Sequence, residues 1–152
     1  MAAHDELHQE VRDRLGRIDQ LYTRGRQAIV DALVGAGTPL TLPALLEQAP
    51  DLTQSSAYRN LSMMEQAGVV RRLVHGNDHA HYELAEGLTG HHHHLVCRGC
   101  GVIRDVTLDR QLERSLDAAF SRIALDVGFR PETHDIDVYG ICADCAADCS
   151  AD

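Results

Sequence analysis

Hydrophobic residues in the first part of the chain recur at helical spacing. Over residues 4–20 they lie four, four and three positions apart, which predicts a helix with a single apolar stripe: Leu7, Val11, Leu15 and Ile18. The same spacing predicts a second helix over residues 24–34, ended by the glycines that follow it. A short helix is predicted to begin at Thr41, and a further helix covers residues 53–67.

The spacing changes after Gly68, where two short apolar runs predict a β-hairpin. The runs cover residues 69–74 and 81–84, with a turn at residues 76–78. Helix, short helix, helix and hairpin is the order of a winged helix-turn-helix, which presents the start of its later helix to DNA. That start carries polar side chains suited to phosphates and base edges: Ser55, Ser56, Tyr58, Arg59 and Asn60. The alternative is a small helical bundle whose exposed face is polar.

A second group of elements follows residue 90. Leu95 and Val96 predict one strand, residues 102–106 a second and residues 133–141 a third. Between the last two lies a long amphipathic helix, with apolar positions at Leu108, Leu112, Leu116, Phe120, Ile123 and Val127. The chain is therefore predicted to be α+β, with a winged helix followed by a compact α/β unit.

Two Cys-x-x-Cys pairs predict a structural zinc site in this second unit. The pairs are Cys97 with Cys100 and Cys142 with Cys145, and together they supply the four thiolates of a tetrahedral site. In a reducing compartment such pairs favour metal over disulfides. The alternative is a redox dithiol, for which one pair would suffice. The fifth cysteine, Cys149, has no pair and is interpreted as a spare thiol.

Four consecutive histidines, His91 to His94, lead directly into the strand of Leu95. Because side chains alternate faces along a strand, His91 and His93 point one way while His92 and His94 point the other. The run therefore predicts two further metal sites rather than one cluster of four histidines. The remaining ligands must come from elsewhere in the chain, and the candidates are His79, His81, Glu83, Glu113 and His134.

Composition changes this picture in two respects. The chain has no apolar run long enough to span a membrane and no secretory signal, so a cytoplasmic protein is predicted. The net charge of −9 is uneven, with −1 on residues 1–75 and −8 on residues 76–152. DNA binding would thus use individually placed arginines rather than a broad basic surface, and the candidates are Arg59 and either Arg24 or Arg26.

Together these features resemble the ferric uptake regulator family of metal-responsive repressors. The resemblance covers nearly the whole chain and rests on these segments: Ser56-Ala57-Tyr58-Arg59-Asn60-Leu61, Ala67-Gly68-Val69-Val70, Tyr82-Glu83-Leu84, His91 to Gly101, Gly128-Phe129, His134, and Tyr139 to Cys145. It implies a homodimer that binds a palindromic double-stranded DNA operator and is not an enzyme. The implied domains are a winged helix over residues 1–84, a hinge over residues 85–90 and a metal-binding dimerisation domain over residues 91–152.

The resemblance also implies three metal sites. The four cysteines of the Cys-x-x-Cys pairs would hold structural zinc. Glu83, His92 and His94 match ligands of a sensing site between the domains. The second site lies inside the dimerisation domain, and its matching residues are His91, His93, Glu113 and His134.

The chain departs from the family's subtypes at the sensing site. Residues 38–40 offer no imidazole where iron- and peroxide-sensing members supply a histidine, and Arg71 and Ala85 stand near the positions of an Asp and a Cys in zinc-sensing relatives. We therefore expect His81, or His79, to replace the missing ligand. Such a set accepts zinc, ferrous iron, manganese or nickel as the regulatory metal, and zinc is favoured because no ligand set diagnostic of iron is complete. The alternatives are a metal-dependent hydrolase, which would leave the winged helix unexplained, and a structural zinc-binding adaptor.

Overall fold

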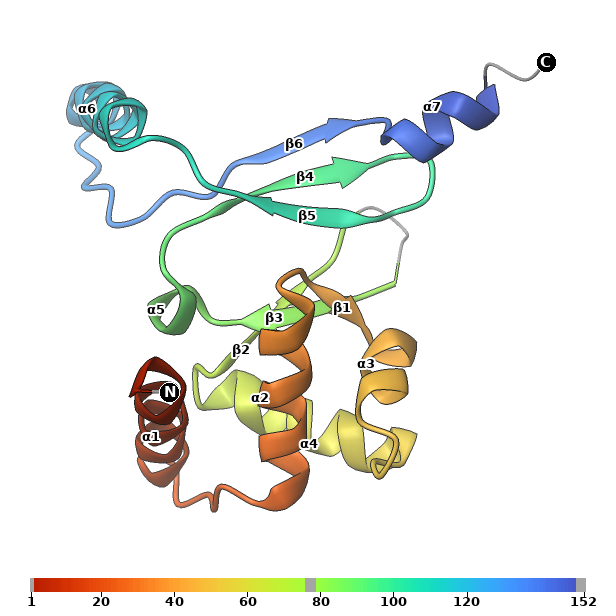
Figure 1. Cartoon of the computed structure of the whole chain (residues 1–152). Coiled ribbons are helices and arrows are strands. Elements are labelled where there is room, and N and C mark those ends of the chain that lie inside the picture. Colours follow the sequence, from red (N-terminus) through yellow and green to blue (C-terminus); the bar gives the residue numbers. More distant parts are fainter. Residues whose placement is uncertain (1, 76–78, 150–152) are drawn as a thin grey trace. The chain divides into compact units, whose positions relative to one another are not determined.

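The computed structural model describes residues 2–75 and 79–149, which form two compact units, residues 1–90 and 91–152 (Figure 1). The predicted hairpin turn at residues 76–78 lies outside the described residues. Residues 85–90, predicted to be a hinge, fall within the first unit and contain a short helix, α5 (Glu86–Thr89). None of the described helices is long and apolar enough to cross a membrane.

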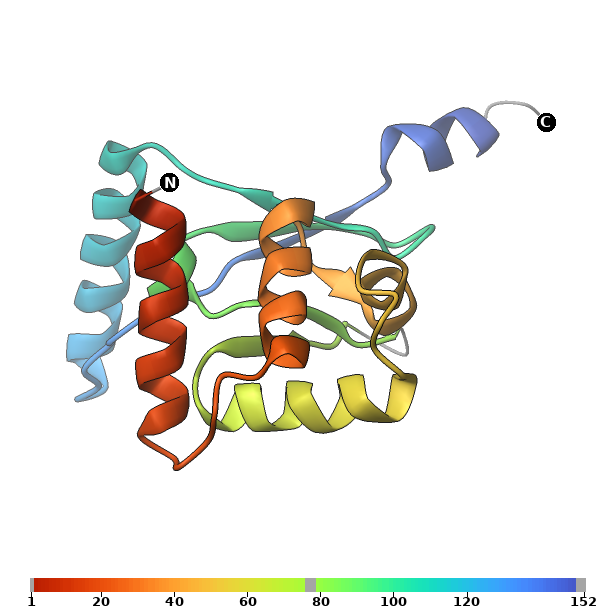
Figure 2. The same ribbon diagram turned by 60° about the horizontal axis from the view of Figure 1, so that its bottom comes forward.

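The first unit is a winged helix. Its helices are α1 (Ala2–Gly16), α2 (Arg24–Ala36), α3 (Leu42–Gln48) and α4 (Gln54–Gln66). Its sheet has the order β1-β3-β2, with antiparallel neighbours β1 (Leu40–Thr41), β2 (Val70–Leu73) and β3 (His81–Leu84). Figure 2 shows α1 beside α2, with α4 crossing below α2.

Threonine caps set where three of these helices begin. Thr23, Thr41 and Thr53 each precede a helix, and each hydroxyl accepts a hydrogen bond from the backbone N–H three residues later. Such a cap satisfies one of the amide groups that the first helical turn leaves without a partner. The predicted apolar stripes then face a common core, in which Val11, Leu15, Ile29, Leu61 and Met64 are almost completely buried.

The second unit is a three-stranded sheet with two helices. The strands are β4 (His93–Cys97), β5 (Ile103–Val106) and β6 (Asp137–Gly140), and the helices are α6 (Arg110–Asp126) and α7 (Ala143–Cys149). Strand β4 lies in the centre, antiparallel to β5 and parallel to β6. Helix α7 is not predicted from the sequence, because its small residues (Ala, Cys and Asp) form no stripe of large apolar side chains; the side chain of Cys149 at its end is not described.

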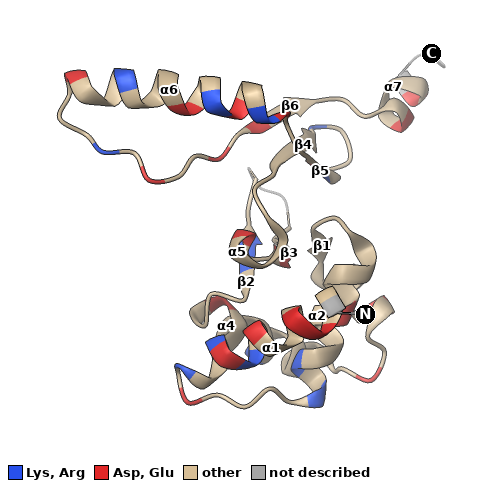
Figure 3. Ribbon diagram, turned by 60° about the vertical axis from the view of Figure 1, so that its left-hand side comes forward, with Lys and Arg blue, Asp and Glu red and all other residues tan. Residues whose placement is uncertain are grey.

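Many large apolar side chains of the second unit are exposed to solvent. They lie on the sheet, on α6 and on the segments that follow both: Leu95, Ile123, Leu125, Val127, Phe129, Val138 and Ile141. Acidic and basic residues are interspersed along the rest of α6 (Figure 3). Apolar surface of this extent on a small unit is typical of a protein–protein interface.

Candidate metal centres and nucleic-acid interface

The four cysteines predicted to bind zinc come together at one end of the β4–β6 pair. Cys97 is the last residue of β4 and is opposite Gly140 of β6, so the parallel pairing brings the two Cys-x-x-Cys segments together. All four Sγ atoms lie within 4.8 Å of one another. Cys100 Sγ and Cys142 Sγ are 3.7 Å apart, close to the edge of roughly 3.8 Å of a tetrahedron built on Zn–S bonds of about 2.3 Å.

Backbone amides around Cys97 favour the thiolate form of this residue, the form that binds metal. Amide groups of Cys100 and Cys142 lower the pKa of Cys97 to about 6, and the Cys142 amide donates to Cys97 Sγ over 3.2 Å. Gly99 leaves the space that the cluster needs, because a Cβ atom there would lie 2.8 Å from Cys145 Sγ. These residues fit a four-thiolate zinc ion.

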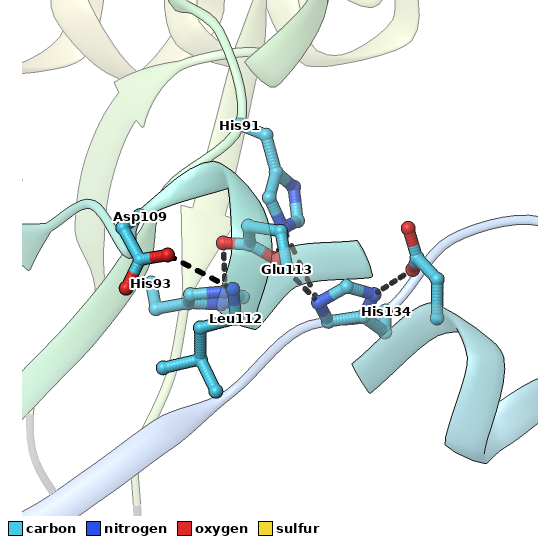
Figure 4. A network of polar contacts seen from close by, with 7 residues as sticks. His91, His93, Asp109, Leu112, Glu113 and His134 are labelled. Atoms are coloured by element: carbon cyan, nitrogen blue, oxygen red, sulfur yellow. Dashed lines mark hydrogen bonds and ion pairs between the residues drawn. The ribbon is translucent and has the colours of Figure 1, made fainter. Parts of the chain in front are cut away.

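Three histidines and a glutamate form a second cluster, which we call the inner cluster: His91, His93, Glu113 and His134 (Figure 4). Asp109 caps α6 by accepting hydrogen bonds from the amides of Gln111 and Leu112. This cap fixes the first turn of α6 and so turns Glu113 toward the histidines (Figure 4). The predicted set of four is therefore brought together within the second unit.

Distances within the inner cluster match a tetrahedral metal site. Glu113 Oε2 lies 3.4 Å from His91 Nε2 and 3.3 Å from His134 Nε2, and these two nitrogens are 3.3 Å apart. His93 Nε2 lies 3.0 Å from Glu113 Oε1. Metal–nitrogen bonds of about 2.0–2.1 Å give tetrahedral edges of roughly 3.3–3.4 Å. The Nδ1 atom of His134 is 3.1 Å from Asp117 Oδ1, a carboxylate contact that orients an imidazole toward a metal.

The opposite face of the second unit's sheet carries a third and wider group, which we call the outer cluster: His92, just before β4, His94 in β4, and Asp105. Asp105 belongs to β5 and pairs directly with His94 in the sheet. Its carboxylate oxygens lie 4.0 Å from His92 Nε2 and 3.9 Å from His94 Nε2. These distances are about half an ångström longer than the tetrahedral edges of the inner cluster. Asp137 Oδ1 contacts His94 Nδ1 at 3.1 Å and leaves Nε2 directed at the outer cluster.

The other residues predicted for the sensing site belong to the first unit. Glu83 and His81 share one face of β3. Glu83 Oε1 lies 3.8 Å from Arg71 Nε on the neighbouring strand. His81 Nδ1 lies 3.0 Å from the carbonyl oxygen of His79, which makes Nδ1 the donor of this hydrogen bond.

Helix α4 presents only part of the predicted DNA-binding set to solvent. Its apolar stripe, led by Ala57, packs into the core, while Ser55, Tyr58 and Arg59 are exposed. Ser56 and Asn60 are half-buried, and the Asn60 amide donates to Ser56 Oγ over 3.4 Å. Arg24, at the first position of α2, is exposed.

Arg26, predicted as an alternative DNA contact, lies inside the first unit. Its guanidinium donates to the carbonyl oxygen of Leu21 over 2.6 Å, to Gln20 Oε1 over 2.8 Å and to Asn60 Oδ1 over 3.3 Å. Its side chain therefore ties the start of α2 to the preceding loop and to α4, rather than reaching outward. An arginine near a helix start is as compatible with this internal role as with phosphate contact, and the sequence alone does not separate the two.

Three carboxylates of these clusters were not predicted from the sequence: Asp105, Asp117 and Asp137. Each contacts a histidine of the inner or outer cluster. Asp117 has a signal that could have found it, because it lies one helical turn after Glu113 and so shares its face of α6. Asp105 and Asp137 depend on the pairing of β5 and β6 with β4, and the hydrophobic pattern does not fix that register.

A winged helix followed by a unit with a four-cysteine cluster and a histidine-rich strand is typical of a DNA-binding regulator that also binds metal. Residues 20–139 match the sequence profile of the ferric uptake regulator family. The chain is 34% identical to the ferric uptake regulation protein of Neisseria meningitidis serogroup A over 103 residues, 68% of this chain and 67% of that protein. It is 29% identical over 150 residues to the peroxide operon regulator of Bacillus subtilis, covering 96% and 97% of the two chains.

The fold agrees with a solved relative of the same kind. The ferric uptake regulator of Helicobacter pylori, described as having three functional metal-binding sites, superposes with a TM-score of 0.73, at 20% identity and over 93% of each chain. The protein belongs to the ferric uptake regulator family. It is a metal-dependent, DNA-binding transcriptional regulator and not an enzyme, and the predicted fold class is confirmed.

Proposed function

We propose that this protein is a cytoplasmic, homodimeric repressor that binds a palindromic operator when a divalent metal, zinc in preference to iron, occupies its outer cluster. The observation that carries the proposal is that four neighbouring histidines are divided between two clusters, and the ligand atoms lie closer together in one cluster than in the other. A site already at metal-binding distances suits a permanent ion, whereas a site with longer distances suits an ion that comes and goes.

Two of the metal sites are structural in this proposal. Zinc bound by Cys97, Cys100, Cys142 and Cys145 holds the end of β4 against the segment after β6. A second metal in the inner cluster fixes α6 and the segment of His134 against β4. Both ions stabilise the second unit, which buries few apolar residues of its own.

The sensing site combines His92, His94 and Asp105 with Glu83, and with His81 or His79, from the first unit. The Glu83 assignment rests on its match to the family's sensing ligand and on its place in β3, nine positions before His92 in the chain. A metal held by ligands from both units would restrict the angle between them. The dimer would then present its two copies of α4, the helix that faces the DNA, at the spacing of the operator half-sites.

Zinc is the favoured effector, with ferrous iron, manganese and nickel as competitors. Histidines suit all four metals, and the second carboxylate that Asp105 adds increases the tolerance of the site for manganese and iron. Selectivity between metals therefore has to come from geometry and availability rather than from the ligand types alone.

The homodimer forms through the exposed apolar residues of the second unit. Leu95 and Val138 lie on the sheet, and Ile123 and Val127 on α6 and its end. Burying such side chains against a second copy contributes about 1.5–3 kcal/mol for each that is fully covered. On the DNA side, Ser55, Tyr58, Arg59 and Arg24 make the contacts, while Ser56, Asn60 and Arg26 hold α4 in position.

Operator binding tests the proposal directly. Fluorescence anisotropy with a duplex from the region upstream of the protein's own gene should show binding with zinc and none in chelator. His92→Ala combined with His94→Ala should abolish the metal dependence while sedimentation still reports a dimer. Unchanged metal-dependent binding by this variant would refute the sensing role, and failure of any metal to promote DNA binding would favour a purely structural zinc protein.

The DNA contacts have a matched pair of variants. Arg59→Ala should weaken operator binding by about 1–3 kcal/mol without changing metal content or thermal stability. Arg26→Ala should instead lower the free energy of unfolding of the first unit by about 2–3 kcal/mol, because it removes three hydrogen bonds from a buried cation. Equal operator affinity for Arg59→Ala and the wild type would remove Arg59 from the interface.

A further inference from the structure

A fourth cluster of potential ligands lies in the first unit, where α1 and α2 run beside each other (Figure 2). His4 and His8 are one turn apart on α1 and so share a face of the helix. That face is turned toward Asp31, which lies in the middle of α2. We call these three residues the N-terminal cluster.

Distances in the N-terminal cluster resemble those of the inner cluster. His4 Nε2 and His8 Nε2 are 3.1 Å apart. Asp31 Oδ1 lies 3.1 Å from His8 Nε2 and 3.6 Å from His4 Nε2. The three distances lie around the edge of roughly 3.3–3.4 Å expected for ligands that share a tetrahedral zinc ion. All three pairs among these atoms are thus close together. A chain of hydrogen bonds would need only two close pairs, so the third favours a shared ion.

Tyr22 supports the inner histidine of this cluster from behind. Its hydroxyl oxygen lies 2.6 Å from His8 Nδ1, and burial and the nearby Asp31 carboxylate raise the pKa of Tyr22 above its ordinary value. The phenol therefore stays protonated at neutral pH. Because a hydroxyl can accept as well as donate, it can take a hydrogen bond from Nδ1–H and leave the Nε2 lone pair for a metal.

Burial gives the cluster one fixed ligand and two accessible ones. The His8 side chain is 10% exposed, whereas His4 and Asp31 are 54% and 48% exposed. An ion would thus have a route from solvent and a coordination position left for water. The first turns of α1 have few buried residues to hold them, since the helix packs mainly through Val11 and Leu15.

We propose that His4, His8 and Asp31 form an additional site for a divalent transition metal, with zinc as the first candidate. Two imidazoles and one carboxylate bind the ion, and water completes its coordination. The ion joins the first turns of α1 to α2. With three ligands, two of them half-exposed, the site binds zinc more weakly than the four-cysteine cluster and fills after it.

Zinc content of the full-length protein tests this site. The protein is dialysed to equilibrium against a series of buffered free-zinc concentrations, and bound zinc is measured by mass spectrometry of the metal. His4→Ala and Asp31→Asn should each bind one zinc per chain less than the wild type at the upper end of the series. Asp5→Asn, a matched control that changes an exposed acid on the same helix, should bind the wild-type amount. Equal zinc content in all four proteins would overturn the proposal and leave the N-terminal cluster as a hydrogen-bonded network only.

NMR of the imidazole nitrogens gives a second test that does not depend on the number of zinc ions bound per chain. Zinc should move the Nε2 resonance of His8 in the wild-type protein and should leave it in place in His4→Ala at the same free zinc concentration. An equal shift in both would overturn the shared site. Because this cluster has no residue in common with the sensing site, its failure leaves the metal dependence of operator binding unchanged, and the two proposals can fail separately.

Discussion

Neighbouring histidines at the start of β4 lie on opposite faces of the sheet, yet the two clusters that they form differ in the distances between their ligand atoms. On one face, His91 and His93 meet Glu113 and His134 at 3.0–3.4 Å. On the other, the oxygens of Asp105 are 3.9–4.0 Å from the nearest imidazole nitrogens. The inner cluster takes all its ligands from one unit, with α6 positioned by its own cap. The outer cluster has three residues in that unit, His92, His94 and Asp105.

The difference shows how one strand can serve two purposes. The alternation of side chains separates adjacent residues onto opposite faces, so each face can be tuned independently. A face covered by a capped helix keeps its ligands at fixed distances. In our proposal the outer face would take a further ligand from the first unit, and metal binding there would then change the conformation of the protein. We expect permanence on the inner face and switching on the outer one.

Loss of the four-cysteine cluster should have the largest effect, because both histidine clusters depend on the sheet that it holds. Structural zinc contributes roughly 10–16 kcal/mol of apparent binding free energy in small domains, which is comparable to the whole stability of a domain. Cys97→Ser should therefore release the zinc and unfold or monomerise the second unit, as measured by metal analysis and sedimentation. A stable, zinc-free dimer would contradict the assignment.

In the inner cluster, replacing a more deeply buried histidine should lower the free energy of unfolding by a larger amount. His93 is 2% exposed and contacts Glu113, so His93→Ala should lower the free energy of unfolding by about 2–4 kcal/mol in zinc. His91 is 34% exposed, and His91→Ala should cost about 1 kcal/mol. Thermal unfolding with zinc and with chelator measures both. If the two variants unfold like the wild type, the inner cluster has no structural role.

Two carboxylates that orient histidines, Asp117 and Asp137, allow the zinc affinity of the inner and the outer cluster to be lowered separately. Asp117→Asn should weaken zinc binding at the inner cluster, and Asp137→Asn at the outer cluster, each by about 10–100-fold, because each carboxylate orients one histidine. Only Asp137→Asn should raise the zinc concentration needed for operator binding. An equal change in both variants would mean that the clusters are not independent.

Arg71 should have the smallest effect, and one of opposite sign. Its guanidinium lies 3.8 Å from the Glu83 carboxylate and is partly exposed, so the pair contributes up to about 1 kcal/mol. Arg71→Gln should remove this competition and increase the metal affinity of the sensing site by up to about fivefold, measured by zinc-dependent operator binding. Arg72→Gln, on the exposed face of the same strand, is the control. A decrease, or the same increase in the control, would argue against Glu83 as a ligand.

Much of this arrangement follows from local patterns in the sequence. The helical spacing of Ala57, Leu61 and Met64 predicts α4, which the structure confirms. The two Cys-x-x-Cys pairs predict the cysteine cluster, and alternation predicts which histidines share a face. These features depend on residues close together in the chain or on ligand types with few other uses.

Features that depend on how distant segments pair were not predicted. Asp105 reaches the outer cluster only because β5 pairs with β4 in a register that places it opposite His94. Arg26 is internal because residues 20, 21 and 60 surround it with oxygen acceptors, and its own neighbours in sequence do not indicate this. The N-terminal cluster likewise requires the packing of α1 on α2, which fixes which turn of α1 meets Asp31.

Operator binding during a zinc titration tests the division between the two faces most directly. Fluorescence anisotropy would follow three proteins against buffered free zinc: the wild type, the outer-face variant His92→Ala with Asp105→Asn, and the inner-face variant His91→Ala. We predict zinc-dependent binding by the wild type and by His91→Ala, and none by the outer-face variant, which should remain folded and dimeric. Loss of the zinc dependence in the inner-face variant, with its retention in the outer-face variant, would contradict the account.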